Sequence, residues 1–152
     1  MPKTLASNRK AFHDYEILDK TEAGIELKGY EVKSARKSNI SLVDSFVRFS
    51  GGQAYADNIY IAPYEQMSLH VKDYDAKRKR RLLLHKQEIT KLQTKVKEKG
   101  LAVIPIEVYV SNKGKIKILI GLGKGKKSYD KKEAIKRKDI KRETARELAN
   151  RR

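Results

Sequence analysis

The chain has 152 residues, of which 36 are Lys or Arg and 19 are Asp or Glu, and its formal net charge is +17. This length fits one domain with an extension, and the lack of cysteine excludes disulfides, thiol catalysis and Cys-ligated zinc. The longest apolar runs are only a few residues long, so we expect no signal peptide, no membrane span and a cytoplasmic protein.

Aromatic and basic side chains are concentrated near the N-terminus. Residues 8–15 read Asn-Arg-Lys-Ala-Phe-His-Asp-Tyr, which combines an amide, two cations, a histidine and two aromatic rings. These side chains suit phosphate contacts, hydrogen bonds to base edges and stacking on unpaired bases. The alternative is a lead-in segment whose Phe12 and Tyr15 close one end of a barrel, and the spacing does not decide between the two.

The next segment is predicted to form a hairpin and then a short helix. Residues 15–18 and 24–27 have strand patterns, separated by a segment with turn-forming residues at its ends. Residues 30–37 contain good helix formers, and Asn39 can follow the helix in a left-handed conformation.

A second hairpin and a long basic loop are predicted in the middle of the chain. Residues 41–49 and 54–61 carry strand patterns on either side of a Gly-Gly pair, which accepts positive φ without steric cost. Residues 62–80 favour a loop, because Pro63 breaks the strand and residues 72–81 contain six cations and two aspartates.

A longer helix is predicted after this loop. Ile89, Leu92 and Val96 form an apolar stripe at helical spacing, with Lys and Glu at other positions, and Gly100 ends the helix. The three leucines at 82–84 open or precede it.

The clearest element is a third hairpin, in which residues 103–110 and 116–122 alternate around an Asn-Lys-Gly turn. Three hairpins and two helices predict a mainly β fold with flanking helices. We expect a small antiparallel closed barrel of the OB-fold type with about six strands, because closure protects the sheet edges most completely. This barrel would be an RNA-binding body spanning residues 1–123.

The last 29 residues, 124–152, contain 13 Lys or Arg against five Asp or Glu and few large apolar side chains. Such a segment cannot offset the entropy of ordering by burying surface, so we expect a basic tail that is disordered when free. The charge of both parts is typical of a protein that binds nucleic acid, and a phosphate-rich surface would favour a helix in the tail. The alternative is a tail that only adds solubility.

Few residues are candidates for catalysis. The three histidines, at 13, 70 and 85, have no metal-ligand spacing, and there is no cysteine. We therefore expect a protein that is not an enzyme, with no catalytic residue, metal or cofactor. An RNA-processing nuclease is one alternative, with His13 and Glu22 as its acid and base. A peripheral membrane protein is disfavoured, because no amphipathic helix has a broad apolar face.

Blocks along almost the whole chain resemble the SmpB (small protein B) family of SsrA-binding proteins. The matching blocks are residues 8–15, 22–36, 58–59, 80–84, 120–127 and 129–131. The resemblance implies an OB-type barrel that binds the tRNA-like domain of transfer-messenger RNA at its elbow and delivers this RNA to stalled ribosomes for trans-translation. It also implies a monomer that contacts ribosomal RNA in the decoding region and messenger path, and that promotes alanine charging indirectly through alanyl-tRNA synthetase.

The resemblance, together with the N-terminal cations, assigns residues to two surfaces. The RNA-binding face comprises Asn8, Arg9, Lys10, His13, Tyr15, Glu22, Lys33, Arg36 and Leu83. The ribosome-engaging tail, helical on the ribosome, comprises Lys124, Gly125, Lys126, Lys127, Tyr129, Asp130, Lys131 and Lys132. Read without the resemblance, Glu22 is equally natural as a turn residue, and Leu83 as a buried residue of the helix stripe.

Two departures from the family pattern concern the tail. Lys132 stands where the family usually has Arg, and Lys cannot reproduce a bidentate guanidinium contact. Ile135 and Ile140 stand in the distal tail, where the family often has an aromatic residue. The alternative function is that of a ribosomal or other OB-type protein that binds structured RNA without a role in ribosome rescue.

Overall fold

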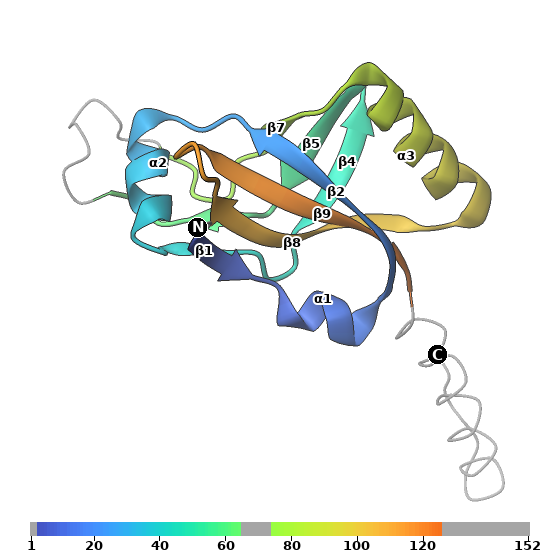
Figure 1. Ribbon diagram of the computed structural model, residues 1–152, viewed down its shortest axis with the longest axis horizontal. Helices are drawn as coiled ribbons and strands as arrows, with labels where there is room; N and C mark the ends of the chain where they lie inside the picture. The colour runs from blue at the N-terminus through green and yellow to red at the C-terminus, as the bar shows by residue number, and fades with distance from the viewer. Residues whose placement is uncertain (1–2, 65–73, 126–152) are drawn as a thin grey trace, which may run out of the picture.

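The computed structural model describes residues 3–64 and 74–125 and places them in antiparallel sheet flanked by three helices (Figure 1). The helices are α1 (Arg9–Asp14), α2 (Gly29–Arg36) and α3 (Lys86–Lys99). The strands are β1 (Lys3–Ser7), β2 (Glu16–Ile25), β3 (Ile40–Ser41), β4 (Phe46–Ser50), β5 (Gln53–Asp57), β6 (Tyr60–Ile61), β7 (Arg80–Leu83), β8 (Ala102–Val110) and β9 (Ile116–Lys124).

Seven strands form one sheet in the order β1-β8-β9-β2-β7-β5-β4, and β3 pairs with β6 in a second sheet of two strands. This architecture confirms the predicted mainly β fold with flanking helices. The predicted closed barrel is wrong. Within the described residues, β1 and β4 are the two edges of the large sheet, and no ladder joins β4 to β1 or to β8.

The strand β8 explains why the sheet stays open, although β4 lies beside it. β1 already pairs with the second half of β8, from Glu107 to Val110. In the first half, Pro105 has no N–H to donate, and the carbonyl of Ile106 accepts the N–H of Asn8 at 2.8 Å. Side chains of α3 and β4 line the seam between β4 and β8. The edge of β4 is therefore covered by side chains and a helix instead of a ladder.

The predicted first hairpin is also wrong. Its residues form the ten-residue strand β2, which pairs with β9 along almost its whole length. Asp19, Lys20 and Glu22, which indicated a turn, are exposed on this strand. Their backbone groups pair with β9, a strand distant in the sequence. Local turn preferences contain no information about such a distant partner. The sequence pattern also did not predict β1 or α1.

The sequence pattern also did not predict β7, but the two helices and the other two hairpins are confirmed, with bounds that differ by a few residues. α2 and α3 are the two predicted helices, and α3 is followed by Gly100, which has a φ of 63°. The run of leucines lies at the end of β7 and precedes α3. β4 and β5 form the second hairpin around Gly51 and Gly52, and β8 and β9 form the third. Tyr60 and Ile61, predicted to continue the second hairpin, form β6.

One hydrophobic core fills the inner side of the sheet. Ile118, Ile120 and Leu122, on alternate positions of β9, are at most 3% exposed, and Ile89 and Leu92 of α3 belong to the same cluster. This burial fixes β9 at the centre of the sheet, between β8 and β2.

Two glycines in β9 give α1 and β2 room on the outer side of the sheet. A Cβ placed on Gly121 would overlap Ile106 Cδ1 and lie 3.2 Å from Ile17 Cγ2. A Cβ placed on Gly123 would lie 3.1 Å from Tyr15 Cβ. Both glycines are buried inside β9. They allow the residues that follow α1 to lie directly on β9.

The variant Gly121→Val is expected to lower the free energy of unfolding by about 1–3 kcal/mol, because the added side chain displaces the buried Ile106. Urea unfolding followed by circular dichroism measures this loss, provided that the m-value is unchanged. The control is Gly29→Ala, since nothing lies within 4 Å of a Cβ placed there. Similar losses in both variants would contradict this role of Gly121.

Candidate nucleic-acid interface

Asn8 joins three elements at one corner of the molecule. Its side chain caps α1, with Oδ1 accepting a hydrogen bond from the Ala11 N–H at 3.1 Å. Its Nδ2 donates to the carbonyl oxygens of Leu42 at 3.2 Å and Pro105 at 2.9 Å, which ties α1 to the turn before β4 and to β8. Asn8 is 4% exposed. Its contribution to an interface is therefore to position this corner.

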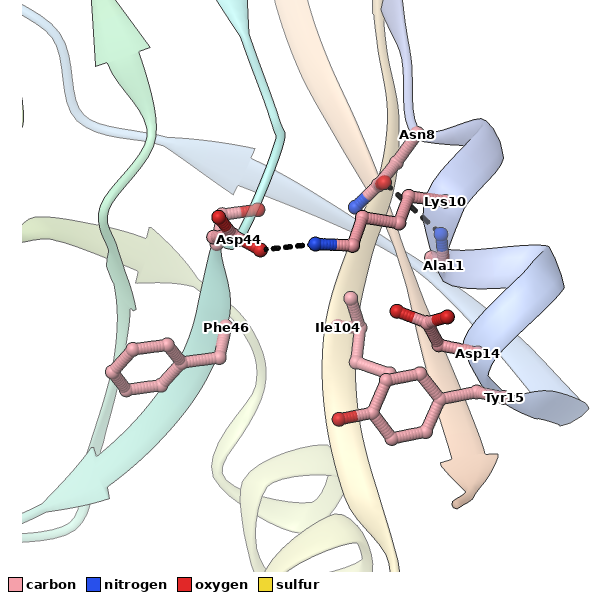
Figure 2. A pocket seen from close by; sticks show the side chains of 9 residues that line it. Asn8, Lys10, Ala11, Asp14, Tyr15, Asp44, Phe46 and Ile104 are labelled. Carbon is pink, nitrogen blue, oxygen red and sulfur yellow. Dashed lines mark hydrogen bonds and ion pairs between the residues drawn. The ribbon is translucent and has the colours of Figure 1, made fainter. Parts of the chain in front are cut away.

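A pocket of ≈ 290 Å³ lies beside Asn8, between α1, the start of β4 and β8 (Figure 2). We call it the corner pocket. Lys10 Nζ reaches across it to Asp44 Oδ1 at 2.9 Å, as Figure 2 shows. This hydrogen bond and the charge of Asp44 raise the pKa of Lys10 above its ordinary value. Tyr15 and Ile104 lie on the β8 side of the pocket.

The rest of α1 presents cations and rings to solvent. Arg9, Phe12 and His13 are exposed, and His13 Nδ1 lies 3.1 Å from Asp14 Oδ1. Lys20 Nζ, on β2, lies 5.5 Å from the centroid of the Phe12 ring, within the range of a cation–π contact. This surface therefore combines positive charge with aromatic area next to the corner pocket.

Glu22 is exposed on β2, and its carboxylate accepts a hydrogen bond from the hydroxyl of Tyr109 on β8. β2 begins directly after α1 and ends shortly before α2. Its exposed residues therefore connect the corner pocket with the region around α2.

A second group of predicted residues meets around α2, and we call it the α2 corner. Arg36 Nη2 donates to the Gly114 carbonyl at 2.5 Å, and Leu83 of β7 is 48% exposed. Both line a hollow of ≈ 350 Å³. Lys33 is exposed, with its Nζ 5.5 Å from the centroid of the Tyr64 ring. The α2 corner thus offers two cations and an apolar surface.

A buried ion network holds α2 against the sheet. Glu31 and Arg80 are both 0% exposed. Glu31 Oε2 accepts from Arg80 Nη2 at 2.6 Å, and Glu31 Oε1 accepts from Arg78 Nη2 at 2.6 Å and from the Lys28 N–H at 2.8 Å. Arg80 also donates to the Ile59 carbonyl at 2.6 Å. The charges are paired within the network, which anchors α2 and its exposed cations.

The same network shifts the pKa values of two side chains, Glu31 and Tyr74. Burial raises the pKa of the Glu31 carboxyl, but hydrogen bonds from Arg78, the Lys28 N–H and Arg80 outweigh this effect and leave the pKa below its ordinary value. Burial and the charge of Glu31 raise the pKa of Tyr74 to about 12. Arg78 and Arg80 both fall in the predicted basic loop, whereas Arg80 is a fully buried residue of β7.

The predicted RNA-binding residues are therefore distributed over two corners and the strand between them. The first corner holds Asn8, Arg9, Lys10, His13 and Tyr15. The second corner holds Lys33, Arg36 and Leu83, and Glu22 lies on β2 between them.

Four residues of the corner pocket lie outside the N-terminal cluster and were not predicted: Asp44, Ser45, Phe46 and Ile104. They come from other parts of the chain. Hydrogen bonds from the Asn8 side chain to the carbonyls of Leu42 and Pro105 hold those parts next to α1.

Two residues of the predicted tail lie within the described part of the chain. Lys124 is the last residue of β9, opposite Glu16, and Gly125 follows it. Outside the described residues lie Lys126, Lys127, Tyr129, Asp130, Lys131 and Lys132.

Across residues 3–64 and 74–125, no group of His, Asp and Glu side chains could hold a metal ion. The helices described there are too short or too polar to cross a membrane.

Comparison with known proteins shows similarity along nearly the whole chain. Residues 5–150 match the family described as SmpB protein. The SsrA-binding protein of Enterococcus hirae is 49% identical over 148 residues, which are 97% of this chain and 94% of that protein. The SsrA-binding protein of Persephonella marina is 55% identical over 141 residues, 93% of this chain and 91% of that protein. A solved structure described as "tmRNA-SmpB: a journey to the center of the bacterial ribosome" is 50% identical, with a TM-score of 0.65, over 79% of this chain and 82% of that one.

Proposed function

The chain belongs to the SmpB family, and from this membership we propose that it binds transfer-messenger RNA, the SsrA RNA, and acts with it in trans-translation on the bacterial ribosome. The observation that carries the proposal is the family match over residues 5–150. The identities of 49% and 55% to two SsrA-binding proteins extend over 94% and 91% of those relatives, so the similarity is not confined to one segment.

The geometry of the described residues supports a contact with folded RNA at two places. We assign phosphate contacts to Arg9, Lys33 and Arg36, which are exposed cations at the two corners. Leu83, 48% exposed beside Arg36, supplies an apolar surface on which a base can rest. Because β2 connects the corners, one RNA surface can contact both.

The proposed role is non-catalytic. His13 contacts Asp14 on α1, and Glu22 accepts a hydrogen bond from Tyr109 on the sheet. The two residues nominated for a nuclease therefore have separate partners on separate elements. This arrangement favours binding over acid–base chemistry.

The finer parts of the proposal follow from the family resemblance. The body, residues 1–123, binds the tRNA-like domain at its elbow, and residues 124–152 become helical in the messenger path, next to ribosomal RNA of the decoding region. The protein promotes alanine charging of the RNA by alanyl-tRNA synthetase without catalysing it. It acts as a monomer in the cytoplasm.

Truncation after Gly125 tests the division of labour between body and tail, and it keeps β9 intact because this strand ends at Lys124. We expect the truncated protein to bind the tRNA-like domain with an affinity within about tenfold of the full chain, since the body keeps its own phosphate contacts. Tagging of incomplete proteins on stalled ribosomes should be abolished. Filter binding and a reconstituted tagging reaction measure the two effects.

A matched control replaces residues 126–152 by a scrambled segment of the same composition. If the tail acts through its sequence, the scrambled protein also fails to tag. Normal tagging by the truncated protein would overturn the role of the tail and favour a simple OB-type RNA-binding protein.

A further inference from the structure

We propose that the hollow at the α2 corner binds one nucleotide that has left its RNA helix, with the phosphate on Lys115 and Lys117 and the base on an apolar floor. This inference rests on the proposed function and adds the turn between β8 and β9 to the RNA interface. It depends on the shape of the hollow, the fixed position of the turn and the charges around the rim.

The hollow lies over a glycine on the outer face of the sheet. Gly24 of β2 pairs with Leu83 of β7 on one side and with Lys117 of β9 on the other. Residues directly opposite one another in paired strands point to the same face, so Leu83 and Lys117 flank a position without a side chain. A Cβ placed on Gly24 would lie 3.1 Å from Leu83 Cβ, so Leu83 rests directly against the β2 backbone. Gly24 therefore keeps the space between an apolar side chain and a cation open.

The floor of the hollow is apolar and suits the face of a base. Val32 of α2 and Ile116 of β9 line it together with Leu83, which is 48% exposed. The volume of ≈ 350 Å³ lies in the range of about 300–1,000 Å³ that small-molecule pockets hold. None of these three side chains can donate or accept a hydrogen bond, so they contact a base without reading its edges. We therefore expect the hollow to accept any base that has left a helix.

Hydrogen bonds hold the turn between β8 and β9 in place before RNA binds. The Ser111 N–H donates to the Lys115 carbonyl at 2.8 Å, and the Gly114 N–H donates to the Ser111 carbonyl at 2.9 Å. Gly114 has a φ of 78°, which a residue with a side chain rarely adopts. Arg36 Nη2 donates to the Gly114 carbonyl and so attaches the turn to α2. The backbone that carries the two lysines is therefore preformed, which reduces the ordering cost of binding.

The rim of the hollow is positively charged. Arg36, Lys115 and Lys117 line it, and none of the described residues that line it is acidic. Lys115 is exposed and Lys117 is half-buried. Within residues 3–64 and 74–125, neither lysine side chain takes part in an ion pair. Both ammonium groups are therefore available to a phosphate.

The carboxylates on β2 and directly after it have other partners. Glu22 accepts a hydrogen bond from the Tyr109 hydroxyl, and Glu26 Oε2 lies 3.4 Å from Arg81 Nη1. These carboxylates are thus not paired with the two lysines. A phosphate that enters the hollow meets positive charge that the protein has not neutralised.

The first test removes the two lysines from the full chain. Lys115→Ala/Lys117→Ala should weaken binding of the tRNA-like domain about tenfold at moderate salt, as measured by filter binding. The slope of log K against log salt should become shallower by roughly 0.7–0.9, the value for one phosphate. The matched control is Lys91→Ala/Lys95→Ala on α3, which also removes one exposed and one half-buried lysine. The control should weaken binding less than about twofold, through the long-range field only.

Two further variants test the floor without changing the charge, and circular dichroism establishes that each is folded. Gly24→Val fills the hollow, and Ile116→Ser removes apolar area from it. Each should weaken binding at least about threefold and leave the salt slope unchanged, because the phosphate contact is kept.

Wild-type affinity in the floor variants would overturn the position of the base. A loss in Lys115→Ala/Lys117→Ala no larger than in the α3 control would overturn the phosphate contact. Either result leaves the proposed function intact if the wild-type chain binds the tRNA-like domain, whereas failure of the wild-type chain to bind would contradict the proposed function itself.

Discussion

Replacing Glu31 by glutamine is expected to lower the free energy of unfolding by about 3–5 kcal/mol, because it leaves a buried guanidinium without its counter-charge. Arg80 is 0% exposed and its Nη2 lies 2.6 Å from Glu31 Oε2. Water therefore does not solvate its charge when Glu31 is replaced. Arg78 is less affected, since 30% of its side chain is exposed. Glutamine keeps the size of the side chain, and the loss therefore reports the charge. Urea unfolding at neutral pH measures it.

An exposed pair of the same chemistry provides the control. Glu26 Oε2 lies 3.4 Å from Arg81 Nη1, and the two side chains are 54% and 44% exposed. Water screens this pair, so Glu26→Gln should change the free energy of unfolding by at most about 1 kcal/mol. If Glu31→Gln costs no more than Glu26→Gln, the buried network does not stabilise the fold in the way described.

Lowering the pH removes the charge of Glu31 without changing the size of its side chain, so it tests the charge separately from the packing. Its pKa in the folded state lies below the ordinary value of 4.5, so the unfolded chain takes up this proton first as the pH falls. The contribution of Glu31 is therefore complete above about pH 4.5 and is lost as the pH falls through the folded pKa. The difference in unfolding free energy between wild type and Glu31→Gln should shrink in this range and stay constant above it.

The sequence predicted those elements whose signals are local. α3 has an apolar stripe and a terminal glycine, and β8 and β9 alternate around a short turn, so neighbouring residues determine them. β2 was predicted as a hairpin because its exposed polar residues resemble a turn when its partner β9, about a hundred residues away, is unknown. The prediction of a closed barrel was wrong for a similar reason. The edge of β8 that would pair with β4 is occupied by β1 and by the hydrogen bond from the Asn8 N–H to the Ile106 carbonyl.

The candidate site was predicted by residue type more than by role. The cluster around Arg9 does form an exposed basic and aromatic surface, but Asn8 within it is a buried cap. Arg80 stands among other cations in the sequence, and its burial depends on Glu31, far away in α2. Asp44 and Phe46 carry no local sign of a pocket. Such roles arise from tertiary contacts, which composition and periodicity do not encode.

The double variant Lys33→Glu/Arg36→Glu is expected to weaken binding of the tRNA-like domain by about 100-fold or more at moderate salt, because two phosphate contacts become repulsive. Both side chains are exposed on α2, which the Glu31 network anchors from its buried side. The slope of log K against log salt should also become shallower by roughly 0.7–0.9 for each phosphate that the variant no longer neutralises. Filter binding between 50 and 200 mM salt measures both effects.

Net charge alone would predict the same loss for any two cations, so the control reverses two lysines elsewhere. Lys86→Glu/Lys91→Glu makes the same change on α3, which lies at the other end of the molecule from α2 (Figure 1). Glu is favourable in the first turn of a helix, so the variant at Lys86 keeps α3 stable. We expect it to lower affinity less than about fivefold, through the long-range field only. Equal losses in the two double variants would show that affinity follows total charge and that the α2 corner is not a contact surface.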